Sequence, residues 1–243
     1  SAVGNDVLGD ETLAVAATTG VCLDYVQRSS LPTSRVLVTL NEVGIPQYEI
    51  VEGVAWDAIE GSDAALKLVE DADVICWGSL AQRSEKSRNS ILSLLDAAPD
   101  TCVKVFDINI RQHYYTREVV EASLERANIL KLNEDELPLV ARMLGVAGGE
   151  KEIVASLIDM YSLKYLIYTH GADFSEVYSA AGEYSHVPTP KDTVGAGDSF
   201  TAVFVTSLLK GDSLKDSHEK AVKVSAYVCT KNGAINPLPE NIF

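Results

Sequence analysis

The chain has 243 residues, 47% of them hydrophobic, which is enough to bury the core of one sizeable body with a small appendage. Acidic residues outnumber basic ones by 35 to 20, giving a formal net charge of −15 at pH 7. This charge repels phosphodiester backbones and anionic lipid, so we expect no nucleic-acid or membrane partner. No run of 18 apolar residues, no leader pattern and no C-x-x-C pair occurs, which predicts a reduced, cytoplasmic protein.

Two short runs between residues 34 and 51 alternate in hydropathy and are separated by a turn at residues 41–46. A period of two on both sides of a turn predicts an antiparallel β-hairpin. We interpret the hairpin as part of a small β lid and assign residues 21–56 to that lid. Residues 1–20 and 57–243 are assigned to an α/β body.

From about residue 70 onward, apolar runs of strand length alternate with helical patterns of about 12 residues. This rhythm predicts a mostly parallel sheet covered on both faces, with its site at the carboxyl ends of the strands. The predicted strands are 73–78, 102–107, 128–132 and 165–169, and the predicted helices are 84–98, 116–127, 134–144 and 150–161.

Two polar groups follow predicted strands. Asp107, Asn109 and Arg111 occupy alternate positions at the end of the strand 102–107, so we expect them to face one way and to mark a site rather than a solvent-facing loop. Asn133 and Glu136 lie where a strand ends and a helix begins. Their spacing fits a capping box, in which each side chain bonds the other residue's backbone N–H. A capping role and a functional role can hold together.

The segment Gly195-Ala-Gly197 precedes a helical pattern that ends near Gly211. A small-residue loop at a helix N-terminus offers unpaired N–H groups to an anion, and Asp198 would stand beside that anion. A carboxylate there fits a base that deprotonates an attacking hydroxyl while the N–H groups neutralise a transferring phosphoryl group. The alternative is an acidic residue that simply favours the helix dipole.

Two other phosphate-binding motifs are excluded by pattern. The loop G-x-x-x-x-G-K-[ST] of P-loop proteins occurs nowhere in the chain. The dinucleotide fingerprint G-x-G-x-x-G fails because Phe200 stands at its third glycine.

The run Asp192-Thr-Val-Gly-Ala-Gly-Asp198 resembles the D-T-x-G-A-G-D signature of the ribokinase-like (PfkB-type) carbohydrate kinases. The resemblance implies a three-layer α/β/α sandwich with a mostly parallel central sheet and a small β lid. It also implies that Asp198 is the catalytic base and that the amides of Gly195, Ala196 and Gly197 form an anion hole.

Further roles are implied by the same resemblance. ATP and Mg²⁺ are the implied cofactors, with K⁺ in some family members and not in others. Arg111 matches an arginine that reaches the substrate or its phosphate, and Asp107, Asn109 and Asp198 belong with it on the substrate side. Glu136 is an Mg²⁺ ligand through water, and Asp192 matches a monovalent-cation site. The residues expected at the nucleotide are Asn133, Glu136, Thr169, Gly171, Thr193, Gly195, Gly197, Asn232 and Gly233. Phe174 departs from the T-x-G-x-x-G nucleotide loop, where a last glycine is expected.

Segments 32–40, 44–48 and 78–81 look most like bacterial fructokinases, which implies ATP-dependent phosphorylation of D-fructose to fructose 6-phosphate. The lid is expected to form a homodimer contact. Residues 1–9 resemble the family's V-G-x-D-x-x-G segment, which a further strand precedes in the family, so we expect that strand before residue 1. The family also has a short apolar segment before its signature, so we expect one before Asp192. Three alternatives stay open: another acceptor (ribose, a nucleoside or 2-keto-3-deoxygluconate), a non-catalytic sugar or nucleotide sensor, and a nicotinamide-dependent oxidoreductase.

Overall fold

The structure is a computed structural model that describes residues 1–41, 45–189, 197–231, 233 and 238–239. It divides into two compact units, which are treated separately below. The first comprises residues 1–73 and 80–102, and the second comprises residues 74–79 and 103–243. The segment 21–56 falls in the first unit together with residues 1–20 and 57–73. Its assignment as a lid stays a prediction.

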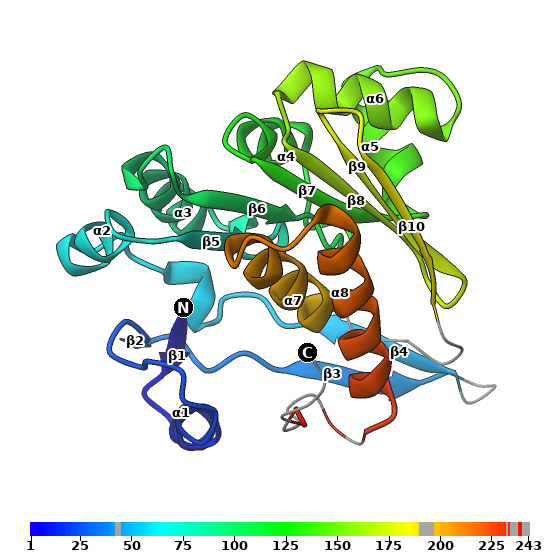
Figure 1. Ribbon diagram of the computed structural model, residues 1–243. Helices are drawn as coiled ribbons and strands as arrows, with labels where there is room; N and C mark the ends of the chain where they lie inside the picture. The colour runs from blue at the N-terminus through cyan, green and yellow to red at the C-terminus, as the bar shows by residue number, and fades with distance from the viewer. Residues whose placement is uncertain (42–44, 190–196, 232, 234–237, 240–243) are drawn as a thin grey trace. The chain divides into compact units, whose positions relative to one another are not determined.

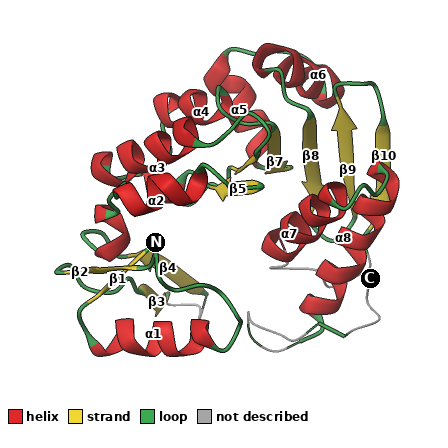
Figure 2. Ribbon diagram, turned by 60° about the vertical axis from the view of Figure 1, so that its left-hand side comes forward, coloured by secondary structure: helices red, strands yellow, loops and turns green. Residues whose placement is uncertain are grey.

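A six-stranded sheet forms the centre of the second unit, in the order β10-β9-β8-β7-β6-β5 (Figure 1). The strands are β5 (Val74–Trp77), β6 (Val103–Asp107), β7 (Ile129–Asn133), β8 (Tyr165–His170), β9 (Phe174–Ser179) and β10 (Tyr184–Pro188). Strands β5 to β8 are parallel, whereas β9 and β10 add antiparallel to the edge. The mostly parallel sheet is therefore confirmed. Figure 2 shows β8, β9 and β10 side by side, with β9 reversed.

Helices cover both faces of this sheet (Figure 1). On one face lie α4 (Arg117–Leu124), α5 (Glu136–Leu144) and α6 (Glu150–Tyr161), and on the other lie α7 (Gly197–Leu209) and α8 (Leu214–Cys229). The α7 face is fixed by a buried cluster in which alternate strand residues meet the apolar stripes of the two helices. Its members include Val105, Ile129, Ile167, Val177, Phe200, Val203, Phe204, Ala221 and Val222.

Local signals explain where several helices begin and end. Thr116 caps α4 by accepting a hydrogen bond from the N–H of Val119. Gly145 ends α5 with a φ of +75°, and Gly211 follows α7 with a φ of +86°. Such positive φ values suit glycine because it has no Cβ. The predicted stop near Gly211 is confirmed.

The first unit contains two small sheets. In one, β1 (Ala2–Gly4) pairs in parallel with β2 (Gln27–Ser29), and α1 (Val7–Ala17) follows β1. Asp6 caps α1 by accepting from the N–H of Gly9 at 2.8 Å, and it also accepts from the N–H of Thr33 at 2.8 Å. The aspartate of the V-G-x-D-x-x-G segment therefore joins α1 to the loop that precedes the hairpin.

In the second small sheet, β3 (Val36–Leu40) pairs antiparallel with β4 (Pro46–Ile50), which confirms the predicted hairpin. Residues 42–44 of its turn lie outside the described residues. The unit also contains α2 (Asp63–Val69), α3 (Glu85–Ala97) and the 3₁₀ turns η1 (Ala55–Ala58) and η2 (Leu80–Gln82).

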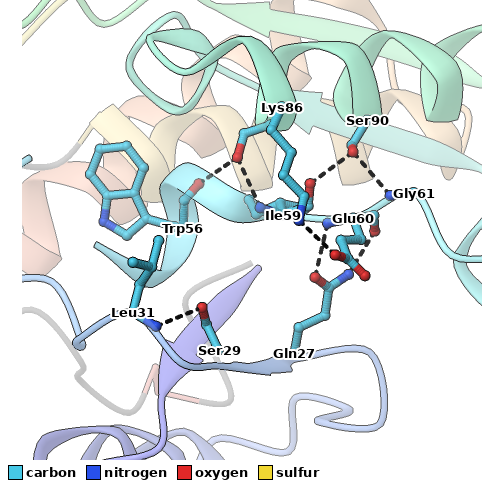
Figure 3. A network of polar contacts seen from close by, with 10 residues as sticks. Gln27, Ser29, Leu31, Trp56, Ile59, Glu60, Gly61, Lys86 and Ser90 are labelled. Atoms are coloured by element: carbon cyan, nitrogen blue, oxygen red, sulfur yellow. Dashed lines mark hydrogen bonds and ion pairs between the residues drawn. The ribbon is translucent and has the colours of Figure 1, made fainter. Parts of the chain in front are cut away.

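A polar network fastens the segment after η1 to its neighbours (Figure 3). The hydroxyl of Ser87 donates to the carbonyl of Trp56, and the hydroxyl of Ser90 donates to that of Ile59. Glu60 is linked to Gln27 through its backbone and to Lys86 by an exposed ion pair of 2.6 Å. The hydroxyl bonds hold the backbone, whereas the exposed pair adds little stability.

No helix within the described ranges has both the length and the apolar character required to cross a bilayer.

Candidate active site

The N-terminus of α7 carries the predicted base. The helix begins at Gly197, and Asp198 lies in its first turn with an exposed side chain. The N–H groups of a first turn have no partner within the helix, and the helix dipole adds positive potential there. An exposed carboxylate and donors for an anion therefore stand next to each other, as phosphoryl transfer to a hydroxyl requires.

The end of β6 and the middle of β7 contact the start of α7. Asp107 at the end of β6 lies opposite Lys131 in the ladder, and the Lys131 ammonium meets the Asp107 Oδ2 atom at 2.6 Å. The Thr201 hydroxyl on α7 lies 3.1 Å from the same Oδ2 atom and 3.0 Å from the Gly197 carbonyl oxygen. A Cβ on Gly197 would stand 3.2 Å from the Lys131 ammonium, so the helix start packs directly on this lysine.

Lys131 and Thr201 were missed from the sequence. For Lys131 the sequence did contain a signal, because this lysine interrupts the apolar run of β7. The structure shows that it is buried, and buried lysines are rare unless they are paired. Thr201 gave no signal, since a threonine within a helix usually only bonds its own backbone. Whether Asp107 also binds substrate stays a prediction.

Asn133 and Glu136 form the expected capping pair. The Asn133 Oδ1 atom accepts from the N–H of Glu136, and the Glu136 Oε2 atom accepts from the N–H of Asn133, both at 2.9 Å. The Glu136 Oε1 atom also accepts from the N–H of Ile110 at 2.7 Å, which ties the loop after β6 to α5. Burial raises the pKa of Glu136, partly offset by these N–H bonds.

The loop after β6 corrects one expectation. The strand ends at Asp107, and Asn109 has a φ of +43°, which is not an extended conformation. The alternation on which a shared orientation of Asp107, Asn109 and Arg111 rested therefore stops at Asp107. Asn109 and Arg111 are exposed, and the Arg111 guanidinium donates to the Ile110 carbonyl at 3.1 Å. The reason is local, because the chain turns here towards α4.

Thr169 and Gly171 lie where β8 turns into β9. The carbonyl of Thr169 accepts from the N–H of Glu134 at 3.1 Å, so this turn adjoins the start of α5. Gly171 has a φ of +48°. Phe174, which replaces the expected glycine, opens β9 and stacks on His170 with ring centroids 4.0 Å apart. The predicted nucleotide loop is thus a tight hairpin turn backed by an aromatic pair.

Several predicted site residues cannot be placed. Asp192, Thr193, Gly195, Ala196 and Asn232 lie outside the described residues, and their roles stay predictions. Gly233 has a φ of +85° and is exposed. Within the described part of the chain, no cluster of three histidine, cysteine, aspartate or glutamate side chains is arranged to hold a metal ion.

Known proteins resemble the chain over nearly its whole length. The profile of the pfkB family carbohydrate kinases matches residues 1–241. An ATP-dependent 6-phosphofructokinase of Thermoanaerobacterium thermosaccharolyticum is 30% identical over 250 residues, covering 99% of this chain and 75% of that protein. A fructokinase of Escherichia coli is 28% identical over 262 residues, covering 98% of this chain and 81% of that protein.

Solved structures agree on the fold. A fructokinase from Xylella fastidiosa with bound ATP matches with a TM-score of 0.81 at 20% identity, covering 96% of this chain and 79% of that one. A ribokinase from Thermotoga maritima matches with a TM-score of 0.75 at 20% identity, covering 96% and 74%. The predicted ribokinase-like α/β fold is confirmed. The chain therefore belongs to the pfkB family of carbohydrate kinases.

Proposed function

We propose that the chain transfers the γ-phosphoryl group of ATP to the 6-hydroxyl of D-fructose, giving fructose 6-phosphate. The observation that carries the proposal is the exposed carboxylate of Asp198 in the first turn of α7, beside helix N–H groups that can receive an anion. Asp198 takes the proton of the attacking hydroxyl, while the N–H groups of the Gly195–Asp198 segment stabilise the transferring group. Arg111, exposed on the loop after β6, offsets phosphate charge with its planar guanidinium.

Glu136 supports the nucleotide side of this site. Both of its oxygens accept a backbone N–H group. A hard cation bound to phosphates keeps several of its waters, and Glu136 would reach it through one of them. Bound Mg²⁺ would neutralise phosphate charge. Asn133 orients Glu136 through the capping pair, and Thr169 and Gly171 border the same end of the sheet. Where a monovalent cation such as K⁺ is used, Asp192 is the residue that would hold it.

The choice of fructose rests on relatives, since a fructokinase of Escherichia coli and the "Probable fructokinase-5" of Arabidopsis thaliana are similar to the chain at 28% and 29% identity. Other names occur among the relatives, including 6-phosphofructokinase and 5-dehydro-2-deoxygluconokinase. A coupled assay of ADP release should compare fructose, fructose 6-phosphate, ribose, a nucleoside and 2-keto-3-deoxygluconate. We expect the highest kcat/KM with fructose. A higher value with any other acceptor would overturn the fructose assignment.

Replacing Asp198 by Asn tests the catalytic role. The amide keeps the shape of the side chain but cannot accept a proton, so we expect kcat to fall by about 10²–10⁴. ATP affinity, measured by calorimetry, should change little because the helix N–H groups remain. Wild-type turnover in this variant would remove Asp198 from its role.

Binding of sugar and ATP without turnover in the wild type would favour a sensor, and stabilisation by NADH rather than ATP would favour an oxidoreductase.

We also propose that a second copy of the chain covers the hairpin. One face of the β3–β4 sheet carries Val36, Val38, Leu40 and Tyr48, whose exposed fractions are 53%, 56%, 69% and 62%. A contiguous apolar face of this kind marks an interaction surface, and isologous pairing is the commonest way to cover it. Light scattering should give a dimer for the wild type and a monomer for Val38→Lys. A monomeric wild type at micromolar concentration would refute the dimer.

A further inference from the structure

Two side chains from different elements converge on the carboxylate of Asp107, which lies on an internal strand of the sheet. Asp107 ends β6, Lys131 lies on β7 and Thr201 lies one turn into α7. The Asp107 Oδ2 atom accepts from both partners, at 2.6 Å from the lysine and 3.1 Å from the threonine. The same Thr201 hydroxyl lies 3.0 Å from the Gly197 carbonyl. The contacts therefore run from the end of β6 and the middle of β7 to the residue that precedes Asp198.

The cost of this arrangement argues against a purely structural role. Lys131 is 8% exposed, and removing an ammonium from water is unfavourable unless it is paired. Its ammonium also lies against Gly197 at the N-terminal end of α7, where the helix dipole disfavours a cation. An apolar residue at this position of β7 would avoid both costs, because its neighbours Ile129, Leu130 and Leu132 are buried apolar residues.

We propose that Asp107, Lys131 and Thr201 form a clamp that positions the first turn of α7, and with it Asp198, for proton abstraction. The proposal rests on the proposed kinase function. Lys131 neutralises Asp107, and the single hydroxyl proton of Thr201 is shared between the Asp107 carboxylate and the Gly197 carbonyl, which ties the carboxylate to the first turn of the helix. All three are positioning residues, and Asp198 is the group that acts on the substrate. Because reaction geometry is sensitive to shifts of about 1 Å, loosening this turn lowers turnover rather than binding.

Thr201→Val tests the clamp with little change in volume. The valine cannot bond to Asp107 or to Gly197, whereas Thr201→Ser keeps the hydroxyl. Thr206→Val is a matched control, because the Thr206 hydroxyl on the same helix bonds the carbonyl four residues back, at 2.8 Å, but not Asp107. Each variant is assayed below its melting temperature. Melting temperature, kcat and both KM values are measured.

We expect the kcat of Thr201→Val to fall about 10- to 100-fold, with KM for sugar and ATP within about threefold of wild type. Thr201→Ser should stay within about threefold of wild type, and Thr206→Val should be unchanged. An unchanged kcat in Thr201→Val, or the same loss in Thr206→Val, would overturn the clamp. A loss confined to the KM for sugar would instead show that this cluster binds substrate directly.

A second readout does not depend on activity. Amide hydrogen exchange in the first turn of α7 should accelerate in Thr201→Val and not in Thr206→Val. Equal protection in the two variants would overturn the clamp. If the wild type phosphorylates no sugar, the kinase proposal fails while the exchange result still decides whether the clamp exists.

Discussion

His218 makes the packing of α8 against the sheet sensitive to acid. The side chain is fully buried, with its Nε2 atom 2.7 Å from the Ser175 hydroxyl on β9 and its Nδ1 atom 2.9 Å from the Ser185 hydroxyl on β10. Phe200 of α7 meets the ring edge-on at 5.7 Å. A neutral imidazole has one donor and one acceptor, which two hydroxyls can satisfy. A protonated ring would be a charge in this pocket with no carboxylate bonded to it.

The size of the effect follows from the shift in pKa. Burial, with a smaller contribution from His186, lowers the pKa of His218 from 6.5 to about 4. Between these values the unfolded chain binds a proton that the folded chain does not, so stability falls as pH drops below 6.5 and is fully present above it. Linkage over this window gives a loss of about 2 kcal/mol in the free energy of unfolding between pH 7 and pH 5.

Urea unfolding of wild type and His218→Gln at pH 7 and pH 5 measures this loss. Glutamine can still donate to one serine and accept from the other, but it does not titrate. We expect the variant to lose about 2 kcal/mol less than wild type between the two pH values. His113→Gln, an exposed position, should keep the wild-type dependence. Equal losses in wild type and His218→Gln would refute the reasoning.

Three further substitutions have defined outcomes. Glu136→Gln turns an NH₂ group towards a backbone N–H, so the free energy of unfolding measured in urea should fall by about 1–3 kcal/mol. Asp135→Asn is the control and should change it little, because the Asp135 carboxylate makes no capping bond. Arg83→Met removes the cation that donates two 2.7 Å bonds to Asp57, a pair whose side chains are 6% and 10% exposed, and leaving that carboxylate without its partner should cost about 3 kcal/mol in the same assay. Gly197→Ala places a methyl group 3.2 Å from the β7 lysine; we expect kcat to fall about tenfold with a melting temperature close to wild type.

The sequence predicted the parallel part of the fold well because its signals are local. Apolar runs gave β5 to β8 almost to the residue, and the predicted helix 150–161 coincides with α6. The antiparallel strands β9 and β10 were missed. Their residues include Glu176, Tyr178, Tyr184 and His186, whose polar groups meet around the Glu176 carboxylate on one face of the sheet. In the sequence these polar residues interrupt the apolar pattern of a strand. In the structure they are satisfied by pairing across the two strands, which the sequence does not reveal.

Contacts within the candidate site were predictable where both residues lie in one short segment of the sequence. Asn133 and Glu136 bond each other within a single capping motif, and Asp198 follows its glycine loop directly. The link between Asp107 and Thr201 joins residues 94 positions apart, and only the folded sheet brings them together. The left-handed conformation of Asn109 likewise depends on the turn after β6, which the alternation of residue types does not reveal.

The charges around α7 explain how a carboxylate can serve beside phosphate. Asp107 is neutralised by Lys131 within 2.6 Å. Glu136 is buried and accepts two backbone N–H groups, so its charge is directed into the protein. Of these three carboxylates, Asp198 is the exposed one. A phosphoryl group that binds at the helix N-terminus is therefore repelled mainly by Asp198, the acid that must accept a proton. The charges of Asp107 and Glu136 are directed to protein groups instead.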